Sequence, residues 1–271
     1  MKPSKDIIEY MDRFQVEKAL ITTTNRRARP TAHLKLADSE SKELNEEQKL
    51  EKMLEFRKSL AMGGQLDHQD IIAIAKKAPE RFYKVFWFNP KIRPEEEDAD
   101  YKILEDHFKK GFCGVKIHSG IHSIKIPKDV VKLVSFMQEY DKDFIFYIHS
   151  TPKTPFFSGI STRDMAKLAK QFPNLRIIVG HAGFCMEYAI DVGISLKQYK
   201  NIFFETSCSV SFAILSLIRT VGHKRLLFGS DAPITSPIQI EIDKILTLPI
   251  SKEEKQDILY NNTKNLLEKI K

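Results

Sequence analysis

The feature that most constrains the fold is a regular alternation of short apolar runs with longer stretches of helical periodicity. From residue 80 onward each run is rich in β-branched and aromatic side chains, which favours strands. This alternation predicts parallel strands joined by helical crossovers. The strand candidates are 83–88, 114–118, 144–149, 176–181, 202–206 and 226–230.

The spacing of the strand ends indicates a barrel. The last five candidates end 31, 32, 25 and 24 residues apart, which suits a βαβ unit of about 30 residues. The runs are apolar on both faces, as strands are when helices cover one side and a barrel interior fills the other. A further run at 19–24 gives seven strands. We therefore predict one α/β domain over residues 1–271, a TIM (β/α)8-type barrel that lacks its first strand.

A barrel with a missing strand has two unpaired edges, and proteins usually cover or pair such edges. We expect the gap between the strands at 19–24 and 226–230 to be open, filled by a terminal segment or closed by a partner. Helices are expected at 3–15, 42–61, 237–247 and 252–270.

Composition excludes several classes of protein. No apolar run approaches the roughly 20 residues that cross a bilayer, and the charged first 14 residues do not form a signal peptide. The three cysteines are far apart and form neither a C-x-x-C pair nor a disulfide framework, so a cytoplasmic location is expected. The net charge is +7, but lysines alternate with acidic residues, which favours solvated helix faces over a nucleic-acid-binding surface.

Titratable side chains recur where the predicted strands end. Lys116 and His118 share parity at the end of one strand, His149 and His181 end the next two, and Asp231 follows the last. A lone histidine at a strand end is more often structural. However, active sites of parallel barrels gather at the carboxyl ends of the strands, so the recurrence predicts that these residues converge on one pocket.

Several fragments resemble a known family, the amidohydrolase-related, metal-dependent hydrolases with TIM-barrel fold. That group also contains decarboxylases of the aminocarboxymuconate-semialdehyde type. The resemblance runs from about residue 3 to residue 270, and the order and spacing of the fragments are more specific than any one of them. The fragments are GFCGVKIH (111–118), VGHAGF (179–184), LLFGSDAP (226–233) and ILYNNTKNLL (258–267).

The resemblance implies roles for three of the strand-end residues. His149 would bind a divalent metal, usually zinc, and Asp231 would bind the metal while accepting a proton from the attacking water. His181 would either bind a second metal or orient the substrate and stabilise developing negative charge. The implied chemistry is coherent, because a metal lowers the pKa of bound water from 15.7 to about 7 and a neighbouring carboxylate can take the proton.

One departure from the family is plain. Members carry His-x-His at the end of the first strand, and this chain has no His-x-His. His33 and His68 lie outside the strand candidates, and His118 and His122 have the wrong spacing. Three explanations stay open: a first segment is absent from this sequence, His118 or His181 replaces the missing ligands, or the barrel works without metal. We favour the first.

Lys116, His118 and Arg26 are predicted to bind substrate. Lys116 could cradle a carboxylate or, if carbamylated, bridge two metals as in some superfamily members; the alternative is an interior lysine paired with Glu205. Arg26 lies in a basic cluster after the strand at 19–24, where it would attract an anionic substrate. The alternative is a loop whose charges meet only solvent.

These features lead to one function hypothesis and two alternatives. The main hypothesis is hydrolysis of an amide, ester or lactone in a small, anionic molecule by metal-activated water. The first alternative is non-oxidative decarboxylation of an unsaturated or aromatic acid, and the second is a metal-free, non-catalytic barrel. A small-molecule substrate is the expected partner, with neither nucleic acid nor membrane, and a homo-oligomer stays open.

Overall fold

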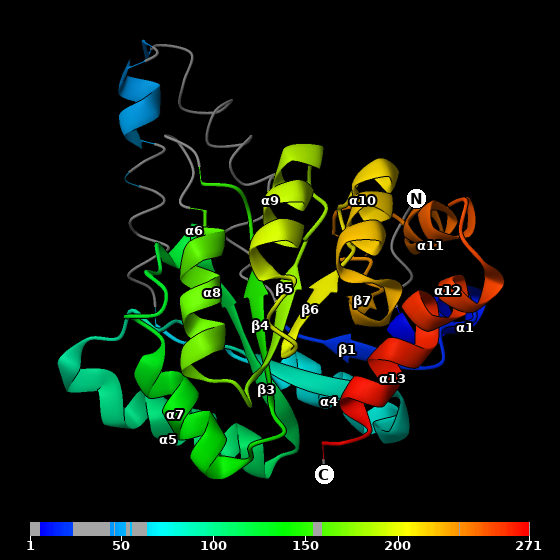
Figure 1. The fold of residues 1–271 in the computed structure, drawn as a ribbon. Coiled ribbons are helices and arrows are strands. Elements are labelled where there is room, and N and C mark those ends of the chain that lie inside the picture. Colours follow the sequence, from blue (N-terminus) through cyan, green and yellow to red (C-terminus); the bar gives the residue numbers. More distant parts are fainter. Residues whose placement is uncertain are drawn as a thin grey trace.

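The computed structural model describes residues 6–23, 44–45, 47–52, 55, 64–153, 159–232 and 234–270. Within that part of the chain, seven strands form one curled parallel sheet whose spatial order is the order of the sequence (Figure 1). The predicted seven-stranded α/β architecture is confirmed. The strands are β1 (Ala19–Ile21), β2 (Phe82–Trp87), β3 (Phe112–His118), β4 (Ile145–His149), β5 (Arg176–Gly180), β6 (Ile202–Glu205) and β7 (Leu226–Leu227).

Helices separate the strands and pack on the outer face of the sheet. In α8, for example, Met165, Leu168 and Ala169 are buried at the spacing of one helix face, and they share a core cluster with Phe146 of β4 and Val179 of β5. The helices are α1 (Ile7–Arg13), α4 (Gln69–Lys77), α5 (Glu97–Lys109), α6 (Ser119–His122), α7 (Val131–Tyr140), α8 (Thr162–Gln171), α9 (Met186–Leu196), α10 (Ser211–Val221), α11 (Ile238–Leu246), α12 (Lys252–Gln256) and α13 (Asn262–Leu267).

Most of the helices expected from the sequence are present. The helix expected at 3–15 is α1, the one at 237–247 is α11, and the one at 252–270 is α12 and α13 joined by a π-helical turn, Asp257–Asn261. The helix expected at 42–61 falls largely outside the described residues, although 47–52 are helical. No helix in the described residues is long and apolar enough to span a membrane.

The inner, concave face of the sheet carries a second and smaller core. Alternate strand residues such as Val85, Ile145 and Ile178 point into it, because successive side chains of a strand face opposite sides. Leu266 and Leu267 of α13 complete this cluster, and both are buried. The C-terminal helix therefore forms part of the floor of the sheet's concave side.

The edges of the sheet are β1 and β7, which do not pair with each other in the described residues. Terminal segments lie across this gap. The interior cluster that contains Leu267 also includes Leu227 of β7, and Leu20 of β1 packs against it. On the same side, the backbone N–H of Ile238 at the start of α11 donates to the Tyr10 hydroxyl of α1 at 3.0 Å. Of the three outcomes expected for the gap, the described residues support filling by a terminal segment.

Replacing Leu267 with alanine should reduce the free energy of unfolding by about 2–5 kcal/mol, because the side chain is 2% exposed and truncation leaves a cavity among packed neighbours. Denaturant unfolding would measure the change. Leu246→Ala on α11 is the matched control, since Leu246 is 48% exposed and surface substitutions usually change stability by about 0.5 kcal/mol or less. Equal effects of the two substitutions would show that α13 is not part of the core.

Candidate functional site

Three neighbouring strands end at the same level and so bring their last residues together. In the parallel ladders, His118 of β3 is level with His149 of β4, which is level with Gly180 of β5. Two residues earlier, Lys116 is level with Tyr147. The alternation of side chains places those of His118, His149, Lys116 and Tyr147 on the concave face, at the carboxyl end where barrel sites form.

The histidines form a contiguous group of rings. His118 and His149 are stacked, with ring centroids 3.6 Å apart and an interplanar angle of 16°, and Trp87 stacks beside His118 at 5.4 Å. The ring of His181 meets His149 edge-on at 4.4 Å, and His181 Nε2 lies 2.9 Å from His149 Nδ1. The structure therefore brings three of the predicted site residues into one cluster.

Both stacked histidines are held neutral. Burial is the largest cause and keeps the pKa of His118 and of His149 well below the ordinary value. Nearby positive charges act in the same direction: Lys116 and His181 lower the pKa of both rings. Neutral imidazoles offer one donor and one acceptor nitrogen each, which is the form that can bind a metal or accept a proton.

His181 sits in the loop directly after β5 in an unusual backbone conformation. Its φ is +59°, which is uncommon for a residue with a side chain. The strain is offset by a hydrogen bond from the His181 backbone N–H to Glu205 Oε2, at 3.0 Å. The preceding residue must be small, because a Cβ on Gly180 would lie 2.5 Å from the ring of Tyr147.

The carboxylate of Glu205, at the end of β6, is the hub of a buried hydrogen-bond network. It accepts from the Tyr147 hydroxyl at 2.8 Å, from the Ser207 backbone N–H at 2.7 Å and from Ser207 Oγ at 2.9 Å. Gly229 after β7 leaves room for it, since a Cβ there would collide with Glu205 Oε1. Because Glu205 makes no ion pair with Lys116 in the described residues, the alternative that the two side chains pair directly is not supported.

Lys116 is a buried cation without an ion pair in the described part of the chain. Its Nζ lies 4.5 Å from the centroid of the Tyr147 ring and 5.7 Å from that of Trp87. Burial lowers the pKa of Lys116, while the negative charges of Asp231 and Glu205 partly oppose that effect. An ammonium in this position can meet an anionic group of a bound molecule.

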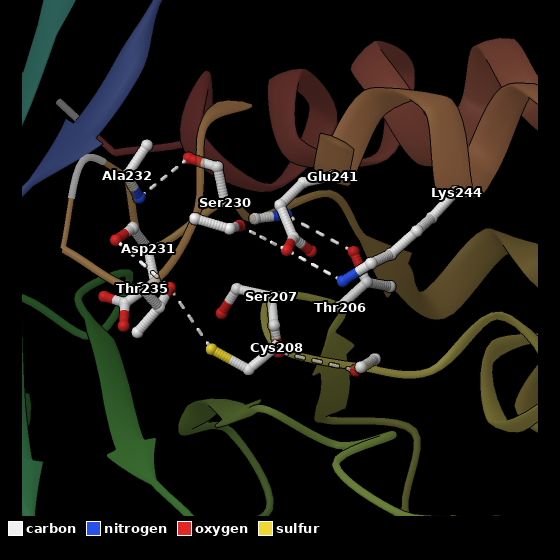
Figure 2. Close-up of polar contacts among 12 residues, drawn as sticks. Thr206, Ser207, Cys208, Ser230, Asp231, Ala232, Thr235, Glu241 and Lys244 are labelled. Carbon is white, nitrogen blue, oxygen red and sulfur yellow. Dashed lines mark hydrogen bonds and ion pairs between the residues drawn. The ribbon is translucent and has the colours of Figure 1, made fainter. Parts of the chain in front are cut away.

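Asp231 follows β7 and lies near enough to Lys116 and His181 for their charges to act on its carboxyl group. Its φ is +49°, so the loop turns sharply at this residue. Burial raises the pKa of Asp231, and the charges of Lys116 and His181 oppose the rise. Thr235 ties this loop to the one after β6, since its Oγ1 donates to the Asp231 carbonyl and accepts from Cys208 Sγ, each at 3.4 Å (Figure 2).

The remaining sequence-predicted residues lie elsewhere. Arg26 and His33 lie outside the described residues, so the substrate-binding role of Arg26 stays a prediction. His68 is a core residue, since its Nε2 accepts from the Trp87 backbone N–H at 2.7 Å and its ring stacks on Phe86 at 4.0 Å.

Two polar residues of the site, Tyr147 and Ser207, were missed by the sequence reasoning. Tyr147 has the parity of His149 in the same strand, which places it on the concave face. That signal could have identified it. Ser207 lies in a loop without periodicity, and the signal for it is the sequence Glu205-Thr206-Ser207, which stands where the family often has a D-T-S pattern.

The fit of this group to a metal ion is partial. Two nitrogens that bind one zinc tetrahedrally at about 2.0–2.1 Å lie about 3.3 Å apart, and His149 Nδ1 and His181 Nε2, which are 2.9 Å apart, would have to separate by a few tenths of an ångström to fit. Within the described residues, however, no group of three or more His, Cys, Asp or Glu side chains is arranged to hold a metal. The ligand set of His149, His181 and Asp231 therefore stays a prediction.

Solved structures with the same fold include enzymes of two reaction types. A 2,6-dihydroxybenzoate decarboxylase from Rhizobium has a TM-score of 0.63 and 17% identity, over 99% of this chain and 89% of that one. A dihydroxybenzoic acid decarboxylase from a Polaromonas species, solved with manganese and 2-nitroresorcinol, has a TM-score of 0.60 and 17% identity, over 97% and 85%.

The third structure is a probable 2-pyrone-4,6-dicarboxylic acid hydrolase from Acinetobacter baumannii, solved with citric acid. Its TM-score is 0.60 and its identity 12%, over 99% of this chain and 93% of that one. At these identities the three similarities establish the fold.

No curated protein gives a match. A family model described as amidohydrolase matches residues 34–269, which is most of the chain and includes each strand-end residue described above. The chain belongs to the amidohydrolase family.

Proposed function

We propose that this protein is a non-oxidative decarboxylase of a small aromatic or unsaturated carboxylic acid. The observation that carries the proposal is the convergence of Lys116, the His149 and His181 pair and Asp231 at the carboxyl end of the sheet. This arrangement combines a buried cation with a proton-bearing group. The names of the Rhizobium and Polaromonas structures, both decarboxylases of dihydroxybenzoic acids, support the same reaction class.

Decarboxylation of such an acid requires a proton and a place for the substrate's negative charge. A proton adds to the carbon that bears the carboxylate, the bond from that carbon to the carboxylate breaks, and its electron pair returns to the unsaturated system. Carbon dioxide leaves, so that R–COO⁻ and H⁺ become R–H and CO2. The reaction is balanced without an oxidant or a second substrate.

Asp231 is the proposed proton donor. Because burial raises its pKa, the protonated form is populated at higher pH than for an exposed aspartate. A half-buried carboxylic acid with a raised pKa can then deliver its proton to the substrate carbon.

The proposed substrate-binding residues are Lys116 and His118, with Arg26 as an expected third. The Lys116 ammonium would hold the substrate carboxylate by a charge-assisted hydrogen bond. The stacked rings of Trp87, His118 and His149 give this part of the site an aromatic wall that suits a planar acid.

His149 and His181 would hold a divalent metal ion, joined by Asp231 while its carboxyl is ionised. The ion would supply positive charge to an anionic oxygen of the substrate, and the protonated Asp231 that delivers the proton would not be a ligand. Manganese is present in the Polaromonas structure, and zinc is the metal expected from the sequence resemblance. The nitrogen pair described above supports two of the ligand positions.

Hydrolysis of an ester or lactone, the main hypothesis from the sequence, is the second candidate. The Acinetobacter structure, a probable hydrolase of a pyrone dicarboxylic acid, supports it. In that reaction Asp231 would act as a base and take a proton from water, so the same residue would be essential.

The proposal is tested by incubating the purified protein with 2,6-dihydroxybenzoate and with 2-pyrone-4,6-dicarboxylate. We expect CO2 release from the first acid and a product one carbon shorter. Asp231→Asn should lower kcat by about 10²–10⁴-fold, because the amide cannot supply the proton. Asp243→Asn on α11, an exposed carboxylate, is the control and should leave kcat unchanged.

Other outcomes would redirect the assignment. Ring opening of the pyrone without CO2 release would identify a hydrolase. No turnover of either compound, in a protein that binds both, would favour the non-catalytic barrel. Activity of Asp231→Asn within about threefold of the parent would remove Asp231 from the mechanism.

Lys116→Met should raise KM for a carboxylated substrate by about 10- to 100-fold, because a hydrogen bond to a charged group contributes about 1.5–3 kcal/mol. Steady-state kinetics would measure it. The control is Lys132→Met, since Lys132 is an exposed lysine of α7, 63% exposed. If both variants keep the parental KM, Lys116 does not bind the substrate carboxylate.

Metal content gives an independent check. We expect elemental analysis of the purified protein to find about one divalent ion per chain and His149→Ala to lose it, because a site with two nitrogen ligands depends on each of them. His223→Ala is a suitable control, since His223 contacts Asp257 at 3.1 Å outside the site. Full retention of metal by His149→Ala would contradict the ligand assignment.

A further inference from the structure

The side chain of His181 has two ring nitrogens in different surroundings. Nε2 faces His149, and Nδ1 faces two oxygens of Ser207. The Ser207 backbone carbonyl lies 3.2 Å from Nδ1 and Ser207 Oγ lies 2.8 Å from it. A carbonyl oxygen can only accept a hydrogen bond. The first contact therefore requires a proton on Nδ1.

The second contact leads to the same result through Glu205. Ser207 Oγ is also 2.9 Å from Glu205 Oε2, and an ionised carboxylate can only accept. The serine hydroxyl therefore donates its single hydrogen to Glu205. Its oxygen is left to accept from His181 Nδ1.

The hydrogen bonds among His181, Ser207 and Glu205 are buried. His181, Glu205 and Ser207 are 3%, 6% and 1% exposed, so water cannot easily replace any of these bonds. Glu205 also accepts from Tyr147 and from two backbone N–H groups. Buried networks of this kind specify one arrangement because an unmatched donor or acceptor is costly.

We propose that Glu205 and Ser207 are positioning residues that lock His181 in the tautomer with hydrogen on Nδ1, so that Nε2 presents a lone pair to the site. His181 then accepts a hydrogen bond from a substrate hydroxyl or binds a cation, and it does not donate to an anionic oxygen. The family resemblance left open whether His181 binds a metal or orients the substrate and stabilises negative charge. This arrangement allows metal binding and the orientation of a substrate hydroxyl, but it does not allow stabilisation of negative charge. Lys116 is then the residue that interacts with negative charge on the substrate.

The tautomer of His181 also determines which nitrogen of His149 carries a hydrogen. In the ligand-free protein, His181 Nε2 can only accept, so the 2.9 Å contact requires a hydrogen on His149 Nδ1. His149 must give up that hydrogen, or turn, before a cation can lie between the two nitrogens. The consequence of this tautomer for catalysis rests on the proposed function, in which His181 faces the substrate.

Nitrogen NMR of the ligand-free protein, labelled with 15N-histidine, tests the proposal at mildly alkaline pH, where the imidazoles are neutral. The His181 signals are assigned by their loss in His181→Asn. We expect a protonated Nδ1 and an unprotonated Nε2. The opposite pattern in the parent protein would overturn the proposal without any further variant.

Glu205→Gln tests which residue sets the tautomer. The glutamine amide can donate to Ser207 Oγ, which frees the serine hydrogen to turn toward His181 Nδ1, and we expect the Nε2-protonated form of His181 to rise to a measurable fraction. Glu241→Gln is the matched control, because Glu241 is also a buried glutamate that accepts from a serine, Ser236, at 2.6 Å. It should leave the His181 signals unchanged.

The results separate this proposal from the proposed function. An unchanged tautomer in folded Glu205→Gln would show that Glu205 does not set it. If that variant does not fold, Ser207→Ala gives the test. His181 Nδ1 then loses the 2.8 Å contact with Ser207 Oγ and keeps the longer one with the carbonyl, at 3.2 Å, so the preference for hydrogen on Nδ1 should weaken and the Nε2-protonated form should rise to a measurable fraction. A protonated Nδ1 in a protein that releases no CO2 would support the tautomer and contradict the decarboxylase.

Discussion

The rest of the site depends on the register of β3, β4 and β5, whose last residues are aligned in the sheet. His118, His149 and Gly180 lie side by side in one parallel ladder, so the stacked histidines and the loop that begins with His181 meet without any long-range adjustment. A shift of one residue in this ladder would turn His149 from the concave face to the helix-covered face. The apolar outer residues of the same strands, such as Phe146 and Ile148, are fully buried against helices and oppose such a shift.

The backbone around the site is strained at two residues and tightly packed at two glycines. His181 and Asp231 both have positive φ, which is costly for residues with side chains, and hydrogen bonds or packing hold them there. Gly180 and Gly229 leave the room that Tyr147 and Glu205 occupy. Two of the short fragments that suggested the family in the sequence, 179–184 and 226–233, are thus places where the backbone turns sharply beside buried polar groups.

Much of the fold and part of the site could be predicted from the sequence, because periodicity encodes them. Each of the seven strands lies within a residue or two of its expected start, and parity alone placed Lys116 and His118 on one face. The hydrogen bonds among Tyr147, Glu205 and Ser207 could not be predicted, because these residues come from two different strands and a loop. The path of a loop has no periodic signature in the sequence. The opposite charges of Lys116 and Glu205 suggested an ion pair as the alternative to a substrate-binding lysine. In the structure, neutral donors surround the Glu205 carboxylate instead.

The concave side of the sheet is closed in part by a helix, and this has a consequence for how the interior can change. A strand is held by backbone hydrogen bonds to its neighbours, and its residues alternate between two faces, so altering one affects the whole ladder. Leu266 and Leu267 reach the interior from α13 through side-chain packing alone. Substitutions near the C-terminus can therefore alter the packing of this interior while the polar residues at the ends of β3, β4 and β5 keep their geometry.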